Sequence, residues 1–380
     1  MIAGKGTALG VVLVCEGMLP NPVRAQEGFQ LRPSLTTTQV HDSNLFSTPS
    51  DRVADFVTRV TPVIESEYRS TRWTLKGRYT FDAERFAEHP ELSSAGARRH
   101  ALAGVEYRPT RRWTLTADGE RSSTQTPGDL TLLTGLALTR ARADRVAAHS
   151  SITRQLDRLT TGTIDYTFTE DRLAGAIEIH THAATVGADH HISSRDIMKV
   201  KSSVYQFAFG SHDEGSLTAT SLALTLGWTR ALARDTEIAV DGGARATNGA
   251  IAPELSGGIR FRFDSGSVSF AYARTQATII GLAGTADTQS ATATAAWSPR
   301  RWLEIAAAPA FVRIRDASAH ANVYRLTLDA SHPIGRNLSV AFGGVANLQD
   351  GDLYARPAGA TIQQQNIMIK IIAQPGLHAR

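Results

Sequence analysis

The sequence contains almost no cysteine and no long apolar run. Cys15 is the only cysteine among 380 residues, so no disulfide can form within the chain. Beyond the N-terminal segment we find no run of about 18 uncharged apolar residues, which argues against spanning a membrane with helices. A membrane-spanning strand needs only about ten residues with every second one apolar, so the apolar content of 42 % leaves that alternative open.

Concentrated charge and catalytic motifs are also lacking. The 40 basic and 36 acidic residues are interspersed, with arginines standing singly between apolar neighbours as in the segment 259–263. A nucleic-acid-binding chain would cluster its basic residues on one element, so we expect no nucleic-acid partner. The chain has no G-x-S-x-G motif, no phosphate loop and no dinucleotide fingerprint. We therefore predict that it is not an enzyme and binds no cofactor.

What the sequence does contain is alternation with a period of two. From Trp73 to Phe81 one face carries Trp, Leu, Gly, Tyr and Phe, while the other carries Thr, Lys, Arg and Thr. Such a strand has one apolar and one polar face. The pattern returns at intervals of about 20 residues along the chain, which is typical of a closed transmembrane β-barrel.

Fifteen segments show this alternation clearly, and three weaker ones fill the gaps between turns. The weaker segments are 29–41, 143–155 and 288–297. Together they predict an all-β, closed antiparallel transmembrane barrel of about 18 strands, within a range of 16 to 18. The clear segments are Phe56 to Tyr68, Trp73 to Phe86, Leu102 to Tyr107, Trp113 to Glu120, Ile164 to Phe168, Ile177 to His182, Val204 to Phe209, Leu222 to Trp228, Ile238 to Ala244, Ile259 to Phe263, Val268 to Tyr272, Leu303 to Ala307, Tyr324 to Ala330, Leu338 to Phe342 and Ile367 to Ala373.

Short turns and longer connections alternate, as they do in outer-membrane barrels with short periplasmic turns and longer outer loops. The turns at 68–73, 107–113 and 297–302 each combine an aromatic residue, Pro or Ser, Arg and Trp. Their aromatic side chains are candidates for a girdle at headgroup depth: Trp73, Tyr107, Trp113, Trp297 and Trp302. The longer connections are 42–54, 87–97, 124–141, 211–216, 247–253, 278–287 and 348–361. Within 124–141 the segment 130–138 is unusually apolar, so it either folds inward as a constriction or extends a strand.

The same alternation predicts which charged residues line the lumen. Both signs are present, which suits a hydrated channel without strong selection for one sign of ion. The candidates are Lys76, Arg78, Asp118, Glu120, Asp165, Glu178, His180, Arg260, Arg262, Glu304, Arg325, Asp329 and Lys370.

Histidine is the one residue type that clusters. Alternation from Ile177 and Ile179 places Glu178, His180 and His182 toward the lumen. Imidazoles two residues apart could share a metal ion. Lumen-facing polar residues without a ligand are far more common, so we predict no metal site.

The N-terminus resembles a secretory signal peptide. Lys5 precedes an apolar stretch at 8–14, and Val23-Arg24-Ala25 provides a small residue at a cleavage point. We expect residues 1–25 to be removed together with Cys15, leaving 26–380 as a single barrel domain in the bacterial outer membrane, in contact with its lipid.

The first hairpin carries a family resemblance. The turn Asp42-Ser43-Asn44-Leu45-Phe46 and the strand 55–62, Asp-Phe-Val-Thr-Arg-Val-Thr-Pro, resemble the outer-membrane barrels called β-barrel porin 2. The resemblance is specific for about the first 120 residues and generic beyond them. It implies an 18-stranded barrel for exopolysaccharide or capsule export, with polysaccharide in the lumen and a periplasmic polysaccharide-export protein as partner. The chain departs from outer-membrane barrels in general in lacking an aromatic residue at its end.

Three functions stay open from the sequence. The resemblance favours a translocation pore for a secreted polysaccharide. A general diffusion porin for small hydrophilic solutes has the same composition, and so does a closed structural or adhesive barrel. The sequence decides neither the transported polymer or solute nor whether the barrel is a monomer or a trimer.

Overall fold

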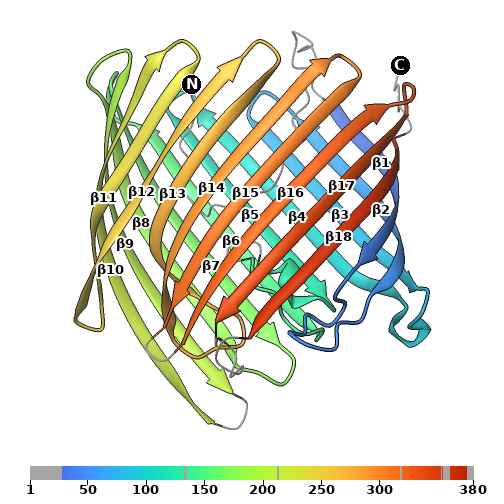
Figure 1. Cartoon of the computed structure of the whole chain (residues 1–380). Coiled ribbons are helices and arrows are strands. Elements are labelled where there is room, and N and C mark those ends of the chain that lie inside the picture. The colour runs from blue at the N-terminus through green and yellow to red at the C-terminus, as the bar shows by residue number, and fades with distance from the viewer. Residues whose placement is uncertain are drawn as a thin grey trace.

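Alternating residues separate into two faces on every strand, and eighteen strands close on themselves (Figure 1). The computed structural model describes residues 28–131, 135–211, 214–316, 319–351, 353 and 360–374. The predicted signal peptide and the final residues 375–380 lie outside this range. The strands are β1 Gly28–Asp42, β2 Asp55–Arg69, β3 Trp73–Phe86, β4 Ser94–Thr110, β5 Trp113–Thr124, β6 Ala143–Gln155, β7 Thr160–Leu173, β8 Glu178–His191, β9 Asp196–Ser211, β10 Glu214–Ala233, β11 Thr236–Thr247, β12 Ala250–Phe263, β13 Gly266–Thr278, β14 Thr285–Arg300, β15 Leu303–Arg315, β16 His320–Pro333, β17 Leu338–Gly351 and β18 Thr361–Ala373.

The first and last strands close the barrel. β1 pairs antiparallel with β2 along its whole length and with β18 from Leu35↔Ala373 to Asp42↔Asn366. Every strand therefore has two hydrogen-bonded neighbours, which removes the free edges that an open sheet would leave. The prediction of a closed antiparallel barrel of 18 strands is confirmed, and each of the eighteen predicted segments lies within or overlaps one strand.

The outer face is apolar and the inner face is polar. On β3, Trp73, Leu75 and Tyr79 are 43 to 46 % exposed on the outside. Asp82 and Glu84 alternate with them on the inside and are buried. The same parity continues around the barrel, with Ile164, Leu224, Phe270 and Ile369 among the exposed outer side chains. An exposed apolar surface of this extent is what a barrel presents to lipid.

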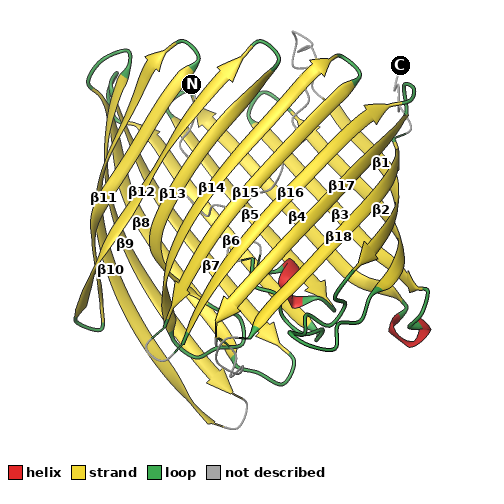
Figure 2. Cartoon of the chain, in the orientation of Figure 1, coloured by secondary structure: helices red, strands yellow, loops and turns green. Residues whose placement is uncertain are grey.

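The two ends differ in the length of their connections. Short turns join the strands at the end where β1 begins and β18 ends, and the longer loops gather at the other end (Figures 1 and 2). We call these the turn end and the loop end. In the described residues, helix occurs only as the 3-10 turns η1 (Pro90–Leu92) and η2 (Pro127–Asp129), both at the loop end. No helix among these residues has the length and apolar content to cross a membrane.

Two predicted long connections are wrong. The predicted connection 247–253 is the two-residue turn Asn248-Gly249, because both residues adopt a positive φ, 47° and 88°. Asn-Gly at the centre of a hairpin takes this conformation readily and matches the twist of the strands. The predicted connection 211–216 is also short, since β9 ends at Ser211 and β10 begins at Glu214.

Candidate functional site

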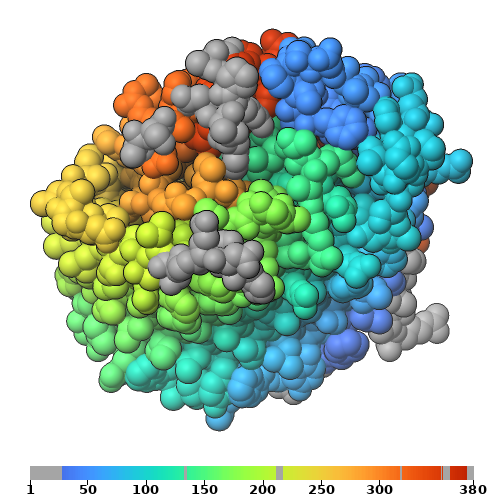
Figure 3. All heavy atoms as spheres, turned by 90° about the horizontal axis from the view of Figure 1, so that it is seen from below, coloured from blue at the N-terminus to red at the C-terminus, as the bar shows by residue number. Residues whose placement is uncertain are grey.

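In the connection between β5 and β6, the described residues 125–131 and 135–142 fold into the barrel at the loop end. Its Leu136 is only 1 % exposed and packs in a cluster with Val312, Ile314 and Val323, which belong to β15 and β16. These strands lie far from β5 and β6 in the strand order. The described residues of the apolar segment, 130–131 and 135–138, thus fold inward and do not extend a strand. Figure 3 looks onto this end, where green atoms reach across toward the orange strands.

Hydrogen bonds and a close backbone approach hold the tip of this loop against the wall. The amide of Ala137 donates to Oε1 of Gln349 at 2.7 Å, and Nδ2 of Asn347 donates to the carbonyl of Gly135 at 3.1 Å. Gly135 has a φ of +63°, and a Cβ there would lie 3.3 Å from Cγ1 of Val323. The tip therefore needs glycine both for its conformation and for its approach to β16.

Ion pairs hold the base of the loop. Glu84 on β3, with a side chain 2 % exposed, lies 2.8 Å from Arg59, 3.8 Å from Arg98 and 3.9 Å from Arg140 of the loop. Arg98 also contacts Asp129 of the loop at 2.7 Å. Burial lowers the pKa of the Arg140 guanidinium, and the charge of Glu84 acts in the opposite direction. We call Arg59, Asp82, Glu84, Arg98, Asp129 and Arg140 the inner network; Asp82 joins it through Arg59 and Arg98.

The residues that carry the family resemblance are structural residues of the same end. Asn44 is fully buried, and its Nδ2 donates to the carbonyls of Thr48 and Gln363 at 2.7 and 2.9 Å. Asp55 is 1 % exposed and accepts hydrogen bonds from the amides of Phe56 and of residues 87–89. Both side chains fix the turns that surround the constriction.

A pocket of about 150 Å³ lies between the inward loop and the wall. Arg59, Glu84 and Arg98 line it from β2 to β4, and Arg325 lines it from β16. Asp42 and the amide side chains Gln364 and Asn366 add polar groups from β1 and β18. This pocket is therefore lined by charges of both signs and by amides, which suits contact with hydrated solutes.

Strand parity places the predicted lumen residues on the inner face, with two exceptions. The inner residues are Lys76, Arg78, Asp118, Glu120, Asp165, Arg260, Arg262, Glu304, Arg325, Asp329 and Lys370. Several of them are paired: Arg78 lies 3.6 Å from Glu65, and Lys370 lies 3.5 Å from Asp329. His149, which the sequence did not single out, bridges Asp118 at 3.2 Å and Asp165 at 3.6 Å.

Glu178 and His180 are the exceptions, because they lie on the outer face. His182, which was also predicted to point toward the lumen, lies on the outer face as well and contacts Tyr166 there. In the pairing of β8 with β7, His180 lies opposite Glu170 and Val186 lies opposite Ile164. His180 and Val186 are an even number of residues apart, so they lie on the same face of β8. Val186 and Ile164 are exposed outer residues. The prediction took Ile179 as lipid-facing, whereas at the loop end it packs inward against Phe207 and Phe209. On β8 the apolar side chain of Ile179 thus faces inward at the loop end, whereas the apolar side chain of Val186 faces outward further along the strand.

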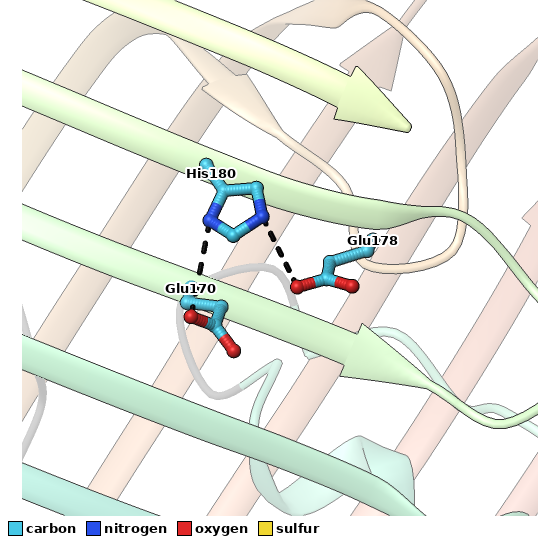
Figure 4. Close-up of side chains that lie close together, drawn as sticks. All are labelled: Glu170, Glu178 and His180. Atoms are coloured by element: carbon cyan, nitrogen blue, oxygen red, sulfur yellow. Dashed lines mark ion pairs between the residues drawn. The ribbon is translucent and has the colours of Figure 1, made fainter. Parts of the chain in front are cut away.

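Glu170, Glu178 and His180 lie close together on the outer face (Figure 4). We call them, together with Arg172, the outer cluster. Nε2 of His180 lies 3.0 Å from Glu178, and its Nδ1 lies 3.8 Å from Glu170. The three groups place ligand atoms within 4.8 Å of one another, a spacing that a metal ion could use. Arg172 contacts the same two carboxylates at 2.7 and 2.8 Å, so a cation of the chain already offsets one of their two negative charges.

The predicted girdle residues all lie at the turn end. Trp73 stacks on Tyr107 with ring centroids 4.0 Å apart, and Arg154 lies over Trp113 at 4.8 Å. Trp297 is 49 % exposed near the end of β14, and Trp302 lies in the next turn against His332. This placement is the one that aromatic belts of membrane proteins have at an interface.

β9 carries an inner row of aromatic side chains that was not predicted from the sequence. Tyr205, Phe207 and Phe209 stack along one face, with centroids 6.1 and 6.4 Å apart, and the buried Arg245 lies over Tyr205. Val204 alternates with them on the outside and is 47 % exposed. Both faces of this strand are apolar in part, so alternation alone did not tell the inside from the outside.

No family model matches the chain, and no curated protein matches it. Solved structures that are similar include the siderophore receptor PirA from Acinetobacter baumannii, with a TM-score of 0.49, 6 % identity and coverage of 92 % of this chain and 81 % of that one. OccK2 (OpdF) from Pseudomonas aeruginosa has a TM-score of 0.48 and 8 % identity, with coverage of 91 % and 98 %. The similarity is one of barrel architecture. These comparisons do not support the resemblance to the β-barrel porin 2 family.

Proposed function

We propose that the chain is an outer-membrane channel for hydrophilic solutes, with a secreted polysaccharide as its cargo. The observation that carries the channel is a barrel with an apolar outer face and a charged, amide-lined inner face. A lumen without a dominant charge suits neutral or weakly charged sugars. The polysaccharide and a periplasmic export partner come from the family resemblance of residues 42–62.

A second candidate is a general diffusion porin for small solutes. The inward loop favours it, because Leu136, Gln349 and Glu84 hold the constriction by buried contacts. A polymer would have to displace this loop or pass beside it, whereas a small sugar would not. A closed structural or adhesive barrel is the third candidate.

Single-channel conductance in a planar bilayer distinguishes the three functions. The refolded protein is measured with and without added long-chain polysaccharide. A steady open conductance that the polymer blocks is the expected result. An open conductance indifferent to polymer would favour the general porin, and a silent protein would contradict the channel itself.

A further inference from the structure

One arginine in the pocket at the constriction makes no ion pair, although Asp129 of the same lining acts on it electrostatically. Arg325 on β16 faces the pocket, and no carboxylate of the described residues contacts its guanidinium. The other three arginines of the lining, Arg59, Arg98 and Arg140, each contact Glu84. Among the described residues, Arg325 is therefore the one arginine of this pocket whose guanidinium makes no ion pair.

The surroundings of Arg325 hold its side chain in position. Its position on β16 pairs with Ala310 on one side and with Asn347 on the other. Asn347 in turn binds the tip of the inward loop, and a Cβ on Gly135 would lie 3.9 Å from Cδ of Arg325. The docked loop thus packs beside the aliphatic part of the side chain, which limits the conformations that the guanidinium samples.

The rest of the pocket wall offers amides and carboxylates, of which Glu84 and Asp129 pair with the other arginines. Gln364 and Asn366 line it from β18, and Asp42 lies at its far side. Asp42 accepts hydrogen bonds from the Asn44 amide at 2.9 Å and from Nε2 of Gln364 at 3.0 and 3.1 Å, and it makes no ion pair with an arginine of the described lining. Amides and a carboxylate of this kind are suited to sugar hydroxyls, which both donate and accept.

We infer that this pocket binds a sugar that carries one carboxylate, such as a uronic acid. The planar guanidinium of Arg325 would take the carboxylate through two parallel hydrogen bonds, and the amide wall would take the hydroxyls. The four arginines of the lining exceed its three carboxylates, Asp42, Glu84 and Asp129, by one charge. This excess matches one added carboxylate, whereas a doubly charged phosphate would need a second cation. The volume of about 150 Å³ admits a few waters or a single sugar ring. The inference rests on the proposed function and names the class of its cargo.

The test is equilibrium binding of galacturonate and galactose to the folded protein in detergent, followed by saturation-transfer NMR. The two sugars differ only in the carboxylate. We expect galacturonate to bind about tenfold more tightly than galactose. R325Q should remove this preference. R325K should keep only part of it, because a lysine ammonium cannot donate two parallel hydrogen bonds to one carboxylate. R121Q, which removes an exposed arginine from the outer face of β5, should keep the wild-type preference.

The outcomes separate the two proposals. Equal binding of the two sugars to the wild-type protein, no binding of either, or an unchanged preference in R325Q would overturn the inference. Each variant is first checked for a folded barrel by its heat-modifiable gel mobility, and the R325K series keeps the test informative if R325Q does not fold. A preference for galacturonate in a protein that conducts no ions would leave the binding site in place and overturn the channel.

Discussion

The inner network and the outer cluster lie at the same end of the barrel and use the same chemistry, arginine against aspartate and glutamate. They differ in burial. Glu84 of the inner network is 2 % exposed, whereas Glu178 and Arg172 of the outer cluster are 27 and 57 % exposed. The inner network joins the wall to the inward loop, while the outer cluster joins neighbouring strands that backbone hydrogen bonds already hold.

This difference shows that the number of ion pairs does not measure how much they contribute to the free energy of unfolding. An exposed pair gains little, because water and salt screen both charges. A buried pair gains little over an apolar replacement, but the loss of one partner leaves an uncompensated charge and is costly. The outer cluster is therefore expected to tolerate substitution, and the inner network is not.

The largest effect is expected for Glu84→Gln. The substitution leaves Arg59, Arg98 and Arg140 around a neutral group, at a cost of roughly 3 to 5 kcal/mol in the free energy of unfolding. The loop should undock as well, since Arg140 loses its partner. Urea unfolding of the folded barrel in detergent measures the first effect, and protease cleavage within residues 125–142 measures the second.

Glu65→Gln is the matched control for this substitution. Glu65 also lies on the inner face and pairs with Arg78, but both side chains are about half exposed, 47 and 49 %. Its variant should unfold at the wild-type urea concentration. Equal losses for the two variants would show that burial does not decide the contribution of these pairs.

The sequence predicted the strands of the barrel better than it predicted which side chains face the lumen. Alternation fixes the strands because the lipid-facing side chains repeat with a period of two, and even the Ala- and Thr-rich segment 288–297 is spaced correctly between turns. The predicted facing of Glu178 and His180 was wrong, because Ile179 between them packs against Phe207 and Phe209 inside the barrel and does not face lipid. Alternation identifies two faces of a strand, but only the register with the neighbouring strands shows which one is outside.

The constriction illustrates a second limit. The apolar residues 130–138 signalled that this connection is unusual, yet its partners on β15 to β17 are more than 170 residues away in the chain. No local pattern encodes such a contact. The hairpin motif with Asn44 and Asp55 was recognisable, and its role in fixing the loop end could be assigned only from its hydrogen bonds.

A smaller effect is expected for Leu136→Ala, which removes the apolar contact of the loop and leaves its ion pairs. The cost should be about 2 kcal/mol, at the low end for a buried leucine, because a loop can relax into the space. We expect more frequent current fluctuations in the open channel as the tip leaves β15 and β16. Leu156→Ala, at a turn leucine that is 54 % exposed, should leave the current unchanged. Quiet traces from the Leu136 variant would mean that the inner network alone holds the loop.

The smallest effect is expected for Glu178→Gln in the outer cluster. Arg172 keeps its contact with Glu170 at 2.7 Å, and the lost contacts with Glu178 are exposed to solvent. The urea midpoint should equal that of the wild-type protein at both low and high salt, because screening leaves little interaction to remove. If this variant lost as much stability as Glu84→Gln, the outer cluster would be as important as the inner network. The contrast between a buried and an exposed set of the same charges would then not hold for this barrel.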